Sequence, residues 1–388
     1  MRFHVKHILL GIAFLLLMIP LAGCWDANEP ERMVYIQGLG VDYKDGEFVV
    51  YLQMLNPSLI AKSESTGKVT QTIVVVGRGK GKTVNEAVFE VYRSSQRRLF
   101  WGHLSFFIFT EEALNNKALE KTIDLFDRYR ETRYGTYIFA TKEPLFDIMT
   151  TLPSLKASTT YTKLNQPEAS YEQSSFIRSV DMRELLIALH EPPHETFIPY
   201  VKTVKKSWKS DVKMKKNIQM AGIASITEKK LKDIIPYEKI KGLRWLNNDL
   251  KRAELSIKVK GLDISVLIEK IKIKKRPLVK GSDVHFKLSI DATVLLQEIA
   301  TERKLKEIEK AVQKTLEQEV ISAYKEGLKT NSDLFRLSET LYREDVKTWA
   351  KIEEDGKIPL TQNSLKQPDV QVKVKMIRSD RQRKFPTL

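Results

Sequence analysis

A single cysteine, Cys24, is the only thiol in this chain of 388 residues. The chain can therefore form no intrachain disulfide and no metal site built from several cysteines. Its folded body has to be stabilised by hydrophobic burial, and a composition of 42% hydrophobic and 29% charged residues is typical of a globular protein. At about 150 residues per domain, the length predicts two or three domains.

The residues around Cys24 resemble a bacterial lipoprotein signal. Arg2 and Lys6 give a short positive segment, and an uncharged, mostly apolar run follows over residues 8–19. That run is shorter than the about 20 residues a membrane-spanning helix needs. Leu21-Ala22-Gly23-Cys24 then matches a lipobox, so we expect cleavage before Cys24 and its modification by S-diacylglyceryl and N-acyl groups. A buried signal-peptide cysteine and an uncleaved anchor are the alternatives.

Two or more acyl chains on one residue give a stable membrane anchor. The mature chain is therefore expected on the extracytoplasmic side of the cell membrane, and it has no second run long enough to span a bilayer. Its formal net charge of +16 would suggest nucleic acid in a cytoplasmic protein. Outside the membrane, anionic lipid headgroups or an acidic protein surface are the expected partners, and we expect no nucleic acid. Each lysine cluster also has a plainer interpretation as a solvated face.

The first half of the chain alternates strand patterns with helix patterns. Two apolar strands, expected at 34–41 and 47–55, flank Asp45-Gly46, a dipeptide that favours a tight hairpin. Further strands are expected at 72–76, 104–109 and 134–140, and helices at 84–94, 111–130 and 181–189. Such alternation predicts a sheet covered by helices, in an α/β or α+β arrangement.

The second half has a different pattern. Val284, Phe286, Leu288 and Ile290 alternate with polar residues, which predicts a half-buried strand. A long helix is expected over 302–328, a second one over 333–351, and a last strand over 370–376. We expect an antiparallel sheet packed against the long helix. The fold class is therefore α+β or mixed α/β, with several domains and helix-covered mixed or antiparallel sheets.

The lysine-rich stretch 202–217 and the return of alternating strands after residue 280 suggest domain boundaries. The expected units are a signal peptide at 1–23, an N-terminal α/β domain at 24–205, a β-rich middle subdomain at 206–276 and a C-terminal α+β domain with the long helix at 277–388.

Two short motifs suggest catalytic or nucleotide chemistry, and both fail on sequence. HEPPH, residues 190–194, matches the zinc pattern H-E-x-x-H, but two prolines disrupt the helix that would place both imidazoles on one face. GRGKGKT, residues 77–83, is one residue too short for a phosphate-binding loop, and we expect its glycines to form a turn. Thr83 and Glu86 instead fit a capping box for the following helix. We therefore expect no metal, no nucleotide and no other cofactor.

The segment RRLFWGH gathers five residues suited to protein recognition: Arg97, Arg98, Phe100, Trp101 and His103. Arginine and aromatic side chains are common anchors of protein interfaces, so we predict a partner-binding surface here. A sheet edge capped by these residues is the alternative. No serine, cysteine or carboxylate pair is arranged for catalysis, so we do not expect an enzyme.

Four segments resemble the Ger(x)C lipoproteins, the C subunits of nutrient germinant receptors in spore-forming bacteria. They are LAGCWDANE, GLGVDYKDGEF (38–48), GKTVNEAVFEVYRSSQRRLFWGHL (81–104) and PDVQVKVKMIR (368–378). The resemblance implies α/β modules, a lipid anchor at Cys24 and a place on the outer face of the spore inner membrane beside integral-membrane A and B subunits. It carries over no catalytic residues.

Two other functions stay open. A lipid-anchored solute-binding protein for a small nutrient would need a cleft between similar lobes, whereas the two halves differ in pattern. A surface hydrolase would need a polar constellation around a residue such as His103.

Overall fold

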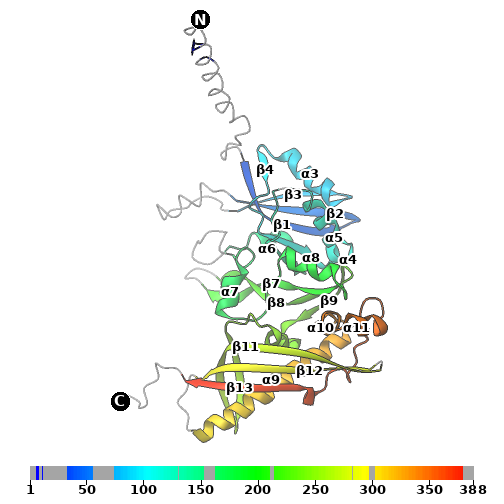
Figure 1. Cartoon of the computed structure of the whole chain (residues 1–388). Coiled ribbons are helices and arrows are strands. Elements are labelled where there is room, and N and C mark those ends of the chain that lie inside the picture. The colour runs from blue at the N-terminus through cyan, green and yellow to red at the C-terminus, as the bar shows by residue number, and fades with distance from the viewer. Residues whose placement is uncertain are drawn as a thin grey trace.

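The computed structural model describes residues 6, 7, 11, 33–55, 74–129, 131–152, 162–209, 214–281, 283–296 and 302–378. These residues form two β-sheets, each covered by helices (Figure 1). The predicted class, α+β or mixed α/β with helix-covered sheets, is therefore confirmed.

The first sheet is mixed and takes the order β3-β2-β1-β5-β6-β7-β8-β9, with the short β4 paired to β1. Its strands are β1 (Met33–Lys44), β2 (Glu47–Leu55), β3 (Val75–Gly81), β4 (Arg98–Phe100), β5 (Phe106–Thr110), β6 (Tyr137–Thr141), β7 (Glu195–Lys209), β8 (Met214–Thr227) and β9 (Lys230–Pro236). The predicted hairpin is confirmed, because β1 and β2 pair antiparallel and Asp45 and Gly46 have φ of 54° and 80°. Positive φ at both turn residues matches the twist of the strands.

Helices cover both faces of this sheet. One face carries α3 (Val84–Ser94), α4 (Glu111–Asn115), α5 (Ala118–Phe126) and α8 (Met182–His190), whose buried side chains share a core with Phe107 and Phe109. The other face carries α6 (Leu145–Met149), which packs with Phe106 and Ile108. Neighbouring residues of β5 point to opposite faces, so this fully buried strand contributes to both cores.

Two local predictions in this half are wrong. The helix expected over 111–130 is divided into α4 and α5, because Lys117 takes a left-handed conformation with φ of 61° between them. The glycine-rich stretch expected as a turn belongs to β3. Its glycines let α3 lie close to the strand: a Cβ on Gly79 would stand 2.2 Å from the carbonyl oxygen of Ala87.

The lysine-rich stretch expected as a boundary belongs, in its described parts, to the antiparallel hairpin of β7 and β8. The boundary expected at 205/206 therefore falls inside β7, and the expected middle unit 206–276 is divided between the two sheets. The physical reason lies in burial. β7 is buried near Glu195 and exposed from Lys205 onward, so its lysines cover the end of a strand that projects beyond the core.

The second sheet takes the order β10-β11-β12-β13. Its strands are β10 (Ala253–Val259), β11 (Leu262–Lys280), β12 (Asp283–Leu296) and β13 (Val370–Arg378). β13 runs parallel to β12, so the sheet is mixed rather than purely antiparallel. The predicted long helix is confirmed as α9 (Glu302–Lys329), and it buries Ile308, Val312, Leu316 and Val320 in the core of this sheet.

The second helix expected after α9 is two helices, α10 (Leu337–Glu344) and α11 (Val346–Ile352). Asp345 leaves the helical conformation between them, with φ of −147°. Its carboxylate instead accepts a hydrogen bond of 3.0 Å from the backbone N–H of Thr348, which caps α11.

The two sheets are joined by a packed connection. The core beneath α9 also includes Ile223 of β8 and Ile235 of β9, which belong to the first sheet. Two short 3-10 turns, η5 (Tyr237–Lys239) and η6 (Lys241–Leu246), lead from β9 toward β10. In η6, Trp245 is fully buried and its Nε1 donates a hydrogen bond of 2.6 Å to Glu319 of α9.

Candidate functional site

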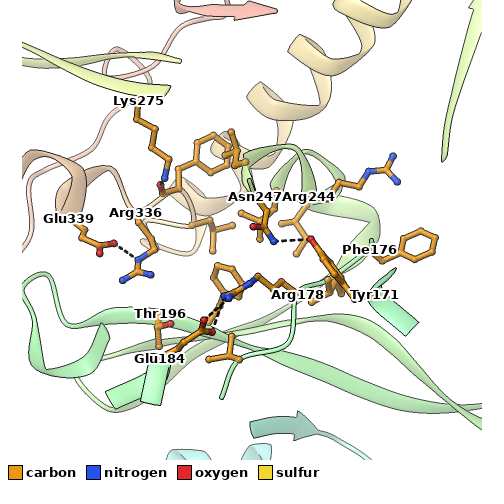
Figure 2. A pocket seen from close by; sticks show the side chains of 18 of the residues that line it. Tyr171, Phe176, Arg178, Glu184, Thr196, Arg244, Asn247, Lys275, Arg336 and Glu339 are labelled. Atoms are coloured by element: carbon orange, nitrogen blue, oxygen red, sulfur yellow. Dashed lines mark hydrogen bonds and ion pairs between the residues drawn. The ribbon is translucent and has the colours of Figure 1, made fainter. Parts of the chain in front are cut away.

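A cavity of about 300 Å³ lies where the two sheets meet (Figure 2). Its walls come from α7 (Pro167–Gln173) and the segment that leads to α8, from the start of β7, from η5 and η6, from β11 and from α10. The cavity has the size of a small ligand pocket, at the lower end of the usual range.

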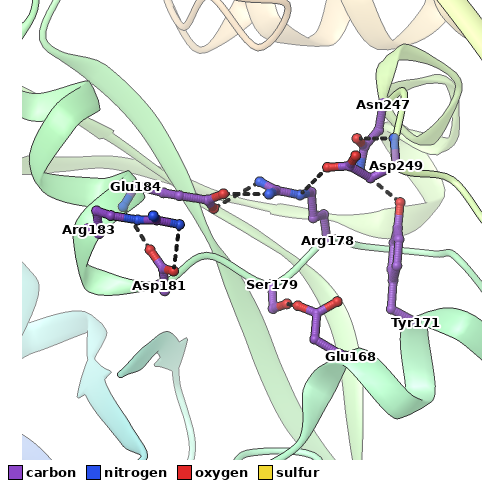
Figure 3. A network of polar contacts seen from close by, with 9 residues as sticks. All are labelled: Glu168, Tyr171, Arg178, Ser179, Asp181, Arg183, Glu184, Asn247 and Asp249. Carbon is purple, nitrogen blue, oxygen red and sulfur yellow. Dashed lines mark hydrogen bonds and ion pairs between the residues drawn. The ribbon is translucent and has the colours of Figure 1, made fainter. Parts of the chain in front are cut away.

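Arg178 is the centre of a polar network on one wall of the cavity (Figure 3). Its guanidinium donates two hydrogen bonds to the carboxylate of Glu184 in α8, one of them 2.9 Å long, and its Nε lies 3.3 Å from a carboxylate oxygen of Asp249. Burial opposes the charge of Arg178, but the two carboxylates outweigh it, and the pKa of Arg178 is raised above its ordinary value. Asp249 lies just before β10, so Arg178 connects the two sheets.

Two further contacts hold the same segments together. The hydroxyl of Tyr171 accepts a hydrogen bond of 2.8 Å from the side-chain amide of Asn247. Burial raises the pKa of Tyr171 to about 12, so its hydroxyl stays protonated at neutral pH. The hydroxyl of Ser175 accepts hydrogen bonds of 3.1 Å from the backbone N–H groups of Lys251 and Arg252. The α7–α8 segment therefore fixes the chain that enters β10.

Lys275 and Arg336 form the opposite wall (Figure 2). Lys275 comes from β11, and its ammonium donates a hydrogen bond to the carbonyl oxygen of Phe335. Burial lowers the pKa of Lys275 below its ordinary value, because desolvation disfavours the charged form. Arg336 has φ of 52° and forms an ion pair with Glu339 of α10.

The lining of the cavity combines charged side chains with an apolar wall. Its charged members are five cations and two carboxylates: Arg178, Arg244, Lys275, Arg336, Arg343, Glu184 and Glu339. Most of the other lining side chains are aliphatic or aromatic, and the described lining contains no serine, cysteine or histidine. Among the described lining cations, Lys275 differs from the arginines, because its ammonium donates to the carbonyl oxygen of Phe335 rather than to a carboxylate. A ligand with a negative group and an apolar body would suit this environment.

A second cavity, of about 740 Å³, lies beside Glu195 and Asp333. Glu195 is only 4% exposed, accepts a hydrogen bond of 3.2 Å from Thr227 and lies 3.5 Å from the ammonium of Lys357. Burial and the neighbouring Asp333 raise the pKa of Glu195 to about 7. Burial also raises the pKa of Asp333. Both carboxyls stand where β7 meets the turn between α9 and α10.

Sequence reasoning missed both cavities. Arg178, Glu184 and Asp249 are unremarkable surface-type residues in the sequence, and Glu195 and Asp333 are far apart in it. Only the folded topology brings these charged groups together, so no local pattern could have identified them.

The predicted partner-binding residues lie along β4 and the turn that follows it. Arg97, Arg98 and His103 are exposed and Phe100 is half-buried. The ring of Tyr35 in β1 lies 5.7 Å from that of Phe100 and 5.0 Å from that of His103. Trp101 differs from the rest, because it is 2% exposed and its Nε1 donates a hydrogen bond of 2.8 Å to the hydroxyl of Tyr92. Trp101 therefore belongs to the core, and the other four residues remain a candidate surface.

Neither short motif takes the geometry that its chemistry needs. The helix α8 ends at His190, and His194 has φ of 58°, so the two imidazoles do not share a helical face. The residues of GRGKG run along β3 rather than around a loop. Thr83 caps α3 by accepting a hydrogen bond of 3.1 Å from the backbone N–H of Glu86, while the Glu86 carboxylate accepts one of 2.8 Å from the N–H of Lys82.

The predicted lipidation site, Cys24, lies outside the described residues. Within the described part of the chain, no helix combines the length and the apolar character needed to cross a membrane.

Two helix-covered sheets, joined by a packed connection with a cavity beside it, define a mixed α+β protein. The crystal structure of the GerBC protein has a similar fold, with a TM-score of 0.51 over 88% of this chain and 96% of that chain, at 16% identity. Residues 26–203 match the spore germination protein N-terminal domain, and residues 221–379 match the spore germination B3/GerAC-like C-terminal domain.

Curated relatives from Bacillus subtilis (strain 168) agree with these matches. Spore germination protein KC is 25% identical over 90% of this chain and 91% of its own length. Spore germination protein B3 is 23% identical over 73% of this chain and 72% of its own length. The chain therefore belongs to the Ger(x)C family of spore germination proteins, as its sequence segments predicted.

Proposed function

We propose that this protein is the lipid-anchored, extracytoplasmic C subunit of a spore nutrient germinant receptor. It acts by assembly with the integral-membrane A and B subunits to trigger germination, not by catalysis. The observation that carries the proposal is the match of both family domains, in order, along nearly the whole chain. The lipobox at Cys24 supports the anchor and a position on the outer face of the spore inner membrane.

The anchor also favours a particular orientation. The first described strand begins at Met33, nine residues after Cys24. Nine residues span at most about 30 Å when fully extended. The edge formed by β4 and the start of β1 is therefore held close to the membrane. We propose that Arg97, Arg98, Phe100 and His103 on this edge contact a membrane subunit. The basic surface of the body also suits anionic lipid headgroups.

Replacement of Cys24 tests the anchor. Cys24→Ala removes the only thiol that can accept a diacylglyceryl group, so the protein should be lost from spore membranes and germination through its own receptor should fall. Tethering raises the effective concentration near the partners toward the millimolar range, and the mutant lacks this advantage. Fractionation of spores and a nutrient germination assay measure both effects.

Asn28→Ala is the matched control, because it lies in the same segment but outside the lipobox. It should fractionate with membranes and respond to nutrient normally. Germination that bypasses receptors should be normal in both strains. A Cys24→Ala protein that stays in the membrane fraction and responds fully would contradict the anchor.

A second candidate function is the binding of a small solute, and the cavity at the joint of the sheets favours it. A ligand bound only by the folded state raises stability by about 2.7 kcal/mol at a concentration of 100 times its Kd. Thermal unfolding with amino acids and sugars should then reveal a ligand whose stabilisation disappears in Lys275→Met. Lys274→Met is the control, because Lys274 is exposed one position earlier in the same strand. The absence of any such shift would remove this candidate.

A further inference from the structure

The open face of the second sheet carries a dense set of cations. Seven exposed basic side chains lie on three adjacent strands: Lys270, Lys272, Lys274 and Arg276 of β11, Lys287 of β12, and Lys373 and Lys375 of β13. In the cross-strand rows that these residues occupy, Asp291 is the one carboxylate. Glu269 lies at the bulge next to Lys270. We call these seven residues the basic face.

Strand register places these residues on one side of the sheet. Lys272 pairs with Asp291, which pairs with Lys373, and the next row joins Lys270, Thr293 and Lys375. Alternate residues of a strand share a face, so the lysines at 270, 272 and 274 point the same way. The residues between them point to the other side, where α9 packs over the apolar core. From Lys270 to Arg276 the basic face extends about 20 Å at roughly 3.3 Å per residue.

Within the described part of the chain, Asp291 is the one carboxylate that stands in the rows of these seven cations. None of the seven side chains forms an ion pair there, whereas many lysines elsewhere do. Like charges on neighbouring strands repel one another and destabilise a sheet. Four of the lysines also border a shallow depression of about 370 Å³, together with Thr293 and Asp291. The lysines of β11 stand on one side of this depression and those of β13 on the other, with Asp291 between them.

Composition distinguishes between the two kinds of anionic surface that could cover the basic face. Protein interfaces are depleted in lysine and enriched in aromatic anchors. Six of the seven cations here are lysines, and these rows contain no aromatic side chain. A broad lysine-rich face without anchors instead matches the way polybasic surfaces bind anionic lipids.

We propose that the basic face binds the anionic phospholipid headgroups of the membrane to which the protein is anchored. This inference rests on the proposed membrane location. It also gives the molecule an orientation, because the strands that carry the basic face, β11, β12 and β13, and the β1–β4 edge lie toward opposite ends of the molecule (Figure 1). With both ends attached, the body lies along the membrane, and the lipid tether and the basic face reinforce each other as two linked sites.

The test uses the mature chain from residue 24 with Cys24→Ala, so that no acyl chain contributes. All three hydrophobic cores lie between Val34 and Met376, which this chain retains. Its partition onto equimolar phosphatidylglycerol–phosphatidylcholine vesicles is measured by co-sedimentation at low and physiological salt. Vesicles of phosphatidylcholine alone are the neutral comparison. We expect binding to the anionic vesicles only, weakened by salt as the Debye length shortens.

Two triple variants with equal charge change locate the contact. Lys272→Gln, Lys373→Gln and Lys375→Gln together should weaken binding on the order of 100-fold, since each lysine near an anionic surface contributes about 5-fold. Lys306→Gln, Lys310→Gln and Lys314→Gln together remove three exposed lysines from α9, on the other side of the same sheet. This control should weaken binding less than about 10-fold, through the loss of net charge alone.

Equal weakening by both variants would overturn the proposal, as would equal binding to neutral vesicles. Retention of the chain by an acidic protein through these lysines, without vesicle binding, would assign the face to a protein partner and also overturn it. Because the test is made without lipidation, its failure leaves the Cys24 anchor untouched, and loss of the anchor would not affect the vesicle result.

Discussion

Glu195 is a buried carboxyl whose protonation the fold shifts toward neutral pH, with Asp333 beside it. Burial and the neighbouring Asp333 raise the pKa of Glu195 from an ordinary value of 4.5 to about 7. Lys357, at 3.5 Å, only partly offsets this effect. The folded state therefore binds a proton more tightly than the unfolded chain between these two pH values.

We predict that the free energy of unfolding falls as pH rises. A carboxyl whose pKa is raised on folding contributes stability that is fully present below about pH 4 and is lost as pH rises through about 7. A shift of this size corresponds to about 3 kcal/mol. Glu195→Gln should therefore flatten the dependence between pH 5 and pH 8, measured by urea unfolding.

Glu344→Gln is the control, because Glu344 is exposed on α10. It should keep the pH dependence of the parent protein. If Glu195→Gln also keeps it, another group is responsible.

At the scale of single residues, the sequence predicted the features that depend only on residues nearby in the chain. Asp45-Gly46 and the cap formed by Thr83 act within a few residues of themselves, and both are found in the structure. The ion pairs of Arg178 and the burial of Lys275 depend on segments that meet only in the folded chain. Trp101 shows why the predicted surface was partly wrong, because an aromatic residue that suits a protein interface also suits a hydrophobic core.

Among the elements, β3 and α3 show how one sequence pattern can suit two structures. The glycines of GRGKG suggest a turn or a phosphate loop, yet they form a strand with a helix packed directly on it. A Cβ at Gly77 or Gly81 would stand 2.9 Å or 2.6 Å from atoms of α3, and at Gly79 it would meet backbone at 2.2 Å. The glycines are therefore required by the distance between the strand and the helix.

We predict that Gly79→Ala destabilises the protein by about 1–3 kcal/mol, because the added methyl group must push α3 away from β3. Thermal or urea unfolding measures this loss. Gly135→Ala is the matched control, since its added Cβ would meet nothing within 4 Å. It should change stability by less than about 1 kcal/mol. Equal stability of both variants would mean that α3 can shift at no cost.

The lysine-rich hairpin of β7 and β8 also suited two structures, because its sequence predicted a domain boundary where the chain forms two paired strands. A run of charge resembles a linker, but a long strand can carry charge wherever it leaves the core. The strands of the second half were easier to predict, because a strand with one buried face alternates clearly, as β12 does.

On the scale of the whole molecule, the number of folded units depends on the packed connection between the two sheets, which we call the joint. Three folded units were expected from composition, and the strands form two sheets whose cores meet through Ile223, Ile235 and Trp245. The polar contacts of Arg178, Tyr171 and Ser175 add a second connection between the same parts. A ligand or a partner that acts on the joint can therefore influence both sheets.

We predict from this joint that the two sheets unfold together, although a chain of this size often unfolds in stages. Differential scanning calorimetry of the chain from residue 24 should show one transition. Leu316→Ala, in the fully buried stripe of α9, should shift that whole transition downward by about 2–5 kcal/mol of stability. Lys314→Ala, exposed on the same helix, should leave the transition nearly unchanged. If Leu316→Ala instead separates the trace into two transitions and moves only one, the sheets are independent, and the joint acts as a hinge rather than as part of a common core.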